Sequence, residues 1–220
     1  MAIVASGLPS LGEVVDRFTA EADQIESVFY SSMGMSRVTE FTIPYAPAED
    51  GCLVSLWDSW NRFVRQLCLV SCAGGVEGLS GVNYAPAISL SESAALSHIQ
   101  LNSKGTKIRG VGGEPYWYDV TAIADLTAVL GLSNASQIVG AITASQIQLG
   151  PFTIPNPIEE IRICRNFVAH KGNGTLTQVR TIAGMGFTDL CRHVRTKRYG
   201  VDLFSDWKEG CRAIAVAAAQ

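Results

Sequence analysis

Two long segments of the sequence repeat apolar residues at steps of three and four, and this spacing restricts the chain to folds built from long helices. Residues 11–33 carry Leu, Val, Phe and Ile at such steps, and residues 52–72 do so more densely. Apolar residues at this spacing share one side of an α-helix. The second segment is apolar around most of its circumference and includes Trp57 and Trp60, which is typical of a helix in a core or a dimer interface. We therefore predict a mainly α-helical protein.

Shorter helical patterns predict further helices over residues 118–130, 134–145, 157–170, 175–184, 187–198 and 203–219. Residues 36–50, which include Pro44 and Pro47, are predicted to be extended. Residues 98–112 contain turn-forming residues between apolar ones and are predicted to form a small β-hairpin insertion. No linker or shift in composition divides the chain, so we expect residues 1–220 to form a single helical-bundle domain.

The charges are unevenly distributed, although the net charge is only −3. Residues 1–160 hold seven Lys/Arg against sixteen Asp/Glu, whereas residues 161–220 hold ten Lys/Arg against four Asp/Glu. A local positive region can attract phosphate groups even on an acidic protein. Part of the basic excess is a cluster formed by Arg192, Arg195, Lys197 and Arg198. An ordinary solvated helix face explains that cluster equally well.

The cysteines, histidines and apolar runs indicate the setting in which the chain works. The six cysteines and three histidines have no spacing typical of a zinc site or a disulfide framework, so we expect neither a metal nor a cofactor. Free thiols fit a reducing cytoplasm. The first residues lack the basic start of a signal peptide, and no apolar run is long enough to cross a membrane. These features predict a cytoplasmic protein that does not associate with membranes.

The segment from Asn156 to Gly172 carries the signals of a short, capped helix. Asn156 suits the N-cap, Pro157 suits the first helical position, and two glutamates follow in the first turn. Gly172 suits the left-handed position that commonly ends a helix. We therefore predict a helix that ends close to His170.

One side of this predicted helix is apolar, and the other carries the chain's best acid–base candidate. The apolar side consists of Ile161, Cys164, Phe167 and Val168. Asn166 and His170 are one turn apart and can reach the same point, while Arg165 lies at the flank. His170 is at the C-terminal end, where the helix dipole favours its protonated form.

Arg165, Asn166 and His170 match the Arg-Asn-x-x-x-His form of the Arg-x4-6-His motif, so this helix resembles the motif helix of the HEPN superfamily. The resemblance implies a HEPN-like helical bundle and a metal-independent endoribonuclease, of the kind used as toxins or in antiviral defence. It implies a homodimer whose two motifs face each other across a cleft, RNA as the substrate, and an antitoxin or a nucleotidyltransferase as a further partner. The catalytic roles would fall on Arg165, Asn166 and His170, with Arg162 and Lys171 as substrate contacts.

Two other interpretations remain open. Some HEPN proteins lack catalysis and bind nucleotides or act as partners of nucleotidyltransferases, and this chain could be such a module. Alternatively, the chain is a structural adaptor in which Arg165 pairs with an acid such as Asp189 or Asp202 and His170 merely ends a helix. An Arg165 buried in an ion pair would favour the adaptor.

Overall fold

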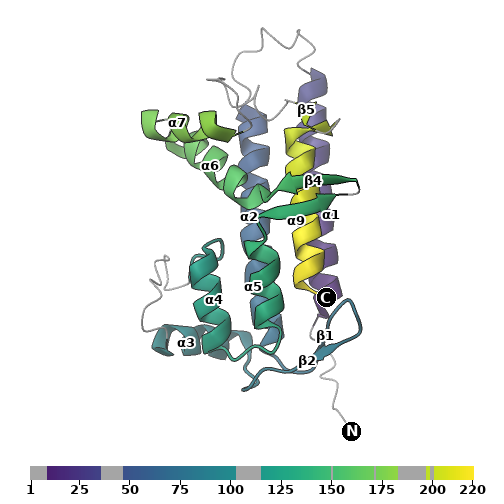
Figure 1. The fold of residues 1–220 in the computed structure, drawn as a ribbon, viewed down its shortest axis with the longest axis vertical. Helices are drawn as coiled ribbons and strands as arrows, with labels where there is room; N and C mark the ends of the chain where they lie inside the picture. Colours follow the sequence, from purple (N-terminus) through teal and green to yellow (C-terminus); the bar gives the residue numbers. More distant parts are fainter. Residues whose placement is uncertain are drawn as a thin grey trace. The chain divides into compact units, whose positions relative to one another are not determined.

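The computed structural model describes residues 9–35, 47–102, 115–149, 151–170, 172–182, 197–198 and 201–220. Within these ranges the chain is mainly α-helical, as the sequence predicts (Figure 1). The helices are α1 (Leu11–Met35), α2 (Pro47–Ser71), α3 (Glu92–Asn102), α4 (Val120–Val129), α5 (Ala135–Thr143), α6 (Pro157–His170), α7 (Asn173–Thr181) and α9 (Leu203–Ala218). The strands are β1 (Val76–Glu77), β2 (Asn83–Tyr84), β3 (Gln146–Leu149), β4 (Phe152–Pro155), β5 (Lys197–Arg198) and β6 (Val201–Asp202). They form three antiparallel pairs, β1–β2, β3–β4 and β5–β6. None of the helices in the described ranges has the length and apolarity needed to cross a membrane.

Backbone contacts divide the chain into two compact units. The first consists of Met1–Phe18, Trp60–Ala144 and Ile214–Gln220, and the second of Thr19–Ser59 and Ser145–Ala213. Helices α1, α2 and α9 each contribute residues to both units. The predicted catalytic residues all belong to the second unit.

The core of the first unit contains a cluster of aromatic rings. Phe18 of α1 packs edge-on against Trp60 of α2, with ring centroids 5.7 Å apart, and Phe63 lies 5.1 Å from Phe18 and 5.3 Å from Trp60. Trp60 is fully buried, and Trp57, which belongs to the second unit, is also buried. The structure thus confirms that the tryptophans of the second predicted helix are core residues, which bury more apolar surface than any other side chain.

A helix cap and a close backbone contact are further features of the first unit. Asp119 caps α4 by accepting a hydrogen bond from the backbone N–H of Ala122 at 3.1 Å. At Gly78 the chain runs directly against the backbone at the C-terminal end of α9, and a Cβ there would lie 2.3 Å from the carbonyl oxygen of Gln220. A side chain at position 78 would therefore push the two segments apart.

In the second unit, α1 and α9 are joined by stacked aromatic rings. The rings of Phe29 and Phe204 are parallel to within 10°, with centroids 4.3 Å apart, and both side chains are fully buried. The β3–β4 hairpin leads directly into α6, and Ile154 of β4 is buried. Helix α6 is followed by α7, which packs against it (Figure 1).

The hairpin predicted at residues 98–112 is wrong in its first part. Residues 98–102 belong to α3, because Ala95 and Ile99 lie one turn apart and are both buried on one side of a helix. Residues 103–112 lie outside the described residues. Small antiparallel strand pairs do occur elsewhere in the described residues, and the longest of them is β3–β4, at residues 146–155.

Two other predicted boundaries also differ from the structure. Helix α2 starts at Pro47, so the end of the segment predicted to be extended is helical; proline is tolerated at a first helical position, and Glu49 and Asp50 follow in the first turn. The rest of that segment, residues 36–46, is outside the described residues. Of the helix predicted over 187–198, only residues 197–198 are described, and they form strand β5.

Candidate active site on helix α6

Helix α6 begins as its sequence predicts. The side-chain oxygen of Asn156 accepts a hydrogen bond from the backbone N–H of Ile158 at 3.0 Å, and Pro157 is the first helical residue. The cap satisfies one of the N–H groups that the first turn leaves without a helical partner. The start of the predicted site helix is therefore fixed by local sequence.

The first half of α6 is anchored to α9. At Gly210 the two helices are so close that a Cβ would lie 2.8 Å from Cγ of Pro157. One turn away, the indole N–H of Trp207 donates to a carboxylate oxygen of Glu160 at 2.7 Å. The missing side chain at Gly210 allows this close approach, and the partly buried hydrogen bond from Trp207 holds this half of α6 against α9.

Burial decreases along α6 towards its C-terminal end. Ile161 and Cys164 are fully buried, as the apolar side was predicted to be, whereas Phe167 and Val168 are only half-buried and His170 is exposed. Burial raises the pKa of the Cys164 thiol far above its usual range, with a further contribution from Glu160. Cys164 is therefore a neutral packing residue, and the groups available for chemistry are at the outer half of the helix.

The prediction that Gly172 ends α6 in a left-handed conformation is wrong. Gly172 is extended, with φ −92° and ψ 159°, and it is the N-cap residue of α7. Its carbonyl oxygen accepts a hydrogen bond from the backbone N–H of Leu176, the first bond of that helix. Because α7 begins at Asn173, only two residues separate the two helices, and the glycine serves the start of α7.

Arg165 is half-buried on the outer half of α6, and its charge is not neutralised by a described carboxylate. It forms no hydrogen bond or ion pair with any residue in the described ranges, and its Nε is buried without a partner. Of the two acids considered as partners, Asp202 instead binds Tyr30 and the backbone N–H of Ser205, and Asp189 lies outside the described residues. A buried donor without an acceptor is unfavourable, and the guanidinium of Arg165 is left without a described counter-charge.

The two predicted substrate contacts differ from Arg165. Arg162 makes a two-pronged ion pair with Glu159, in which Nε and Nη2 donate to the two carboxylate oxygens at 2.7 and 2.5 Å. This pair engages the guanidinium edge that would otherwise bind a phosphate. Lys171 lies outside the described residues.

Asn166 and His170 lie one turn apart on α6, as predicted. Asn166 is half-buried and His170 is exposed. No hydrogen bond between the two is present in the described structure, so neither the amide nor the imidazole is committed to the other. The helix brings both side chains, together with Arg165, to its outer half, and an exposed imidazole there can exchange protons with a bound molecule.

A comparison of the chain with protein-family models, curated proteins and solved structures returned no match. No group of three or more His, Cys, Asp or Glu side chains in the described ranges is arranged to hold a metal ion. The chemical groups on the outer half of α6 are an imidazole, a carboxamide and a guanidinium.

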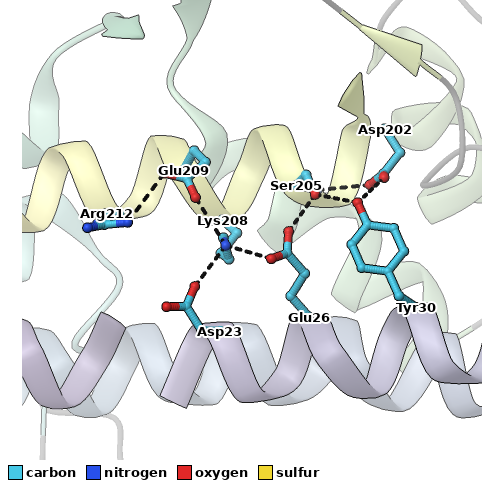
Figure 2. Close-up of polar contacts among 8 residues, drawn as sticks. All are labelled: Asp23, Glu26, Tyr30, Asp202, Ser205, Lys208, Glu209 and Arg212. Atoms are coloured by element: carbon cyan, nitrogen blue, oxygen red, sulfur yellow. Dashed lines mark hydrogen bonds and ion pairs between the residues drawn. The ribbon is translucent and has the colours of Figure 1, made fainter. Parts of the chain in front are cut away.

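A polar network in the second unit was not predicted from the sequence (Figure 2). Lys208 of α9 is buried, and its ammonium binds Asp23 at 2.8 Å, Glu26 at 2.6 Å and Glu209 at 3.0 Å. The other oxygen of Glu26 accepts a hydrogen bond of 2.5 Å from the hydroxyl of Ser205. This network links α1 to α9.

The network continues to the start of α9. The hydroxyls of Tyr30 and Ser205 are 2.6 Å apart, and the Tyr30 hydroxyl donates to Asp202.

Burial alone would lower the pKa of Lys208, but its hydrogen bonds to the three carboxylates more than offset this and raise the pKa above its usual range. The lysine is thus a fixed cation, unsuited to act as a base. The one signal in the sequence was a lysine within the apolar repeat of residues 203–219.

Proposed function

We propose that this protein is a metal-independent endoribonuclease of HEPN type that acts as a homodimer in toxin or antiviral systems. The observation that carries the proposal is the outer half of α6, where Arg165 lacks a described counter-charge and His170 is exposed beside Asn166. Cytoplasmic RNA would be the substrate, and an antitoxin or a nucleotidyltransferase would be a further partner. Cleavage would require no metal or other cofactor.

In this mechanism, His170 of one copy takes the proton from a ribose 2′-hydroxyl, and the 2′-oxygen attacks the adjacent phosphorus. The bond from phosphorus to the 5′-oxygen breaks, and His170 of the partner subunit protonates that oxygen. The products are a 2′,3′-cyclic phosphate and a free 5′-hydroxyl. Arg165 stabilises the negative charge that builds up on the phosphoryl oxygens, because its planar donor edge fits two of them.

Asn166 has a positioning role in the same step. Its carboxamide lies one turn before His170, from where it can orient the ribose hydroxyl or hold the imidazole ring. Because a single α6 provides one histidine, the base and the acid come from two copies of the chain. The active form is therefore a dimer.

The test is cleavage of a single-stranded RNA by purified protein in the presence of a chelator. Wild-type protein should cut the RNA, and His170→Ala should reduce the rate by about 10²- to 10⁴-fold, the usual contribution of a general acid or base. The matched control is His98→Ala, because His98 lies on α3 in the first unit and its contacts are local, to Asn102. It should cleave at the wild-type rate.

The outcomes separate the enzyme from the binding module. Equal cleavage by His170→Ala and His98→Ala would exclude this mechanism. Nucleotide binding without RNA cleavage by the wild-type protein would instead identify a non-catalytic HEPN-like module. A 2′,3′-cyclic phosphate at the product end, found by mass spectrometry, would identify the 2′-hydroxyl as the nucleophile.

A further inference from the structure

Helix α7 shares the unusual charge balance of the outer half of α6. No aspartate or glutamate occurs between Ile161 and Ile182, a stretch that spans most of α6 and all of α7. Arg180, near the end of α7, is exposed and has no ion pair with any residue in the described ranges. A cation without a described carboxylate partner can attract phosphate groups.

The side of α7 that carries Arg180 is polar along its length. Asn173, Thr177 and Arg180 are spaced at i, i+4 and i+7, so they form one stripe, and all three are exposed. Val179, which is turned about 100° around the helix from Arg180, is buried. The stripe therefore lies on a different side of α7 from Val179.

One of the three side chains in this stripe is already hydrogen-bonded within α7. The hydroxyl of Thr177 donates to the backbone carbonyl of Asn173 at 3.0 Å. The side chains of Asn173 and Arg180 have no partner among the described residues, and they are separated by about 10 Å along the helix axis. Asn173 follows His170 by only three residues, so the stripe begins where the predicted site ends.

We infer that the α7 stripe of Asn173, Thr177 and Arg180 binds the sugar–phosphate backbone of single-stranded RNA next to the scissile bond. This inference rests on the proposed function. Arg180 contacts one phosphate beyond the scissile one, and the Asn173 carboxamide contacts a ribose or phosphate oxygen between them. A single strand fits better than a duplex, because two helical turns with one arginine are too small to span duplex grooves, and attack by a 2′-hydroxyl needs a strand free to adopt in-line geometry.

Arg180→Gln tests this role, since glutamine keeps helix propensity and removes the charge. Its matched control is Arg17→Gln, because Arg17 is an exposed arginine on α1 in the first unit. Cleavage is measured on a dinucleotide, which covers only the scissile phosphate, and on a twelve-nucleotide RNA. Binding of the longer RNA is measured by fluorescence anisotropy at several salt concentrations, in a His170→Ala background that leaves the strand intact.

Arg180→Gln should raise KM for the longer RNA by about two- to fivefold, as expected for one lost exposed ion pair, with kcat unchanged. The slope of log affinity against log salt should decrease by about 0.7, the value for one phosphate contact on a single strand. Kinetics on the dinucleotide should equal those of Arg17→Gln. A purely structural role for Arg180 would change both substrates alike.

The two possible failures are distinct. If cleavage depends on His170 but Arg180→Gln matches Arg17→Gln in KM and in salt slope, the α7 inference is overturned and the proposed function stands. If wild-type protein neither cuts nor binds RNA, the proposed function fails, and the α7 inference fails with it.

Discussion

The second unit contains two cations, Lys208 and Arg165, that differ in whether carboxylates neutralise their charge. Lys208 is surrounded by three carboxylates at 2.6 to 3.0 Å, and each of its ammonium protons has an acceptor. Arg165 has no described carboxylate, and its Nε is buried without an acceptor. A cation that serves only the fold is supplied with its own counter-charges. Arg165 instead carries a charge that no described carboxylate neutralises, and this difference is the basis for proposing a site on α6.

Arg162 lies between these two extremes. It is on the same helix as Arg165, but Glu159 binds it through both carboxylate oxygens. The pair is partly exposed, so its net contribution to stability is small and a phosphate could displace the carboxylate. The two arginines of α6 therefore differ in their counter-charges, and we expect them to differ in what they can bind.

The largest effect expected from this comparison is on stability, in Lys208→Met. The substitution keeps the length of the stem but leaves Glu26, whose side chain is only 19% exposed, without its cation. The free energy of unfolding should fall by about 3 kcal/mol at pH 7, the lower end for breaking a buried pair, because Asp23 and Glu209 are well exposed and can be hydrated. Urea denaturation followed by circular dichroism measures it.

The matched control for Lys208→Met is Arg212→Met. Arg212 is exposed, and its one described ion pair, with Glu209, is long at 3.9 Å. Its loss should lower the free energy of unfolding by about 0.5 kcal/mol or less. If the two variants were equally stable, the Lys208 network would contribute little, and the contrast with Arg165 would lose its basis.

The same substitution at Arg165 should affect activity and leave stability unchanged. Arg165→Met keeps the packing of the stem and removes an unpartnered buried donor, so the free energy of unfolding should change by less than about 0.5 kcal/mol. RNA cleavage should slow by about 10²-fold, equivalent to about 2.7 kcal/mol of transition-state stabilisation. Denaturation and cleavage rates of one preparation give both values. A loss of more than about 2 kcal/mol of stability with unchanged cleavage would make Arg165 a structural residue.

The parts of the fold that depend on local signals were predictable from the sequence. The N-cap at Asn156, the proline at the first position of α6 and the long apolar repeats of α1, α2 and α9 all depend on residues close in sequence. The buried Ile161 and Cys164 and the exposed His170 follow from the helical period alone. The predicted apolar side of α6 is thus buried at Ile161 and Cys164 but only half-buried at Phe167 and Val168.

The parts that depend on distant partners were not predictable. Lys208 is buried because Asp23 and Glu26, far away in the sequence, supply its counter-charges. Residues 98–102 are helical because Ile99 packs in a core that the local turn signals do not reveal. Gly172 was predicted to end α6 in a left-handed conformation, whereas it is extended and caps the start of α7. Local sequence determines which segments can form a helix or a strand, and tertiary contacts determine which of these structures forms.

The smallest expected effect concerns Tyr30, at the edge of the Lys208 network. Burial and the hydrogen bond to Asp202 raise the pKa of Tyr30 to about 12, against 10.0 in an unfolded chain. Since the folded pKa is the higher one, the stabilisation should be complete below pH 10 and disappear as the pH rises through 12. Tyr30→Phe should therefore unfold at a lower temperature than wild type at pH 8, by an amount equivalent to about 1 kcal/mol or less. Thermal melts of both proteins from pH 8 to pH 12 measure the gap, and the titration of the other tyrosines cancels in the difference. A gap that persists unchanged at pH 12 would show that the phenol is not bound to a carboxylate, and the network of satisfied charges would end at Ser205.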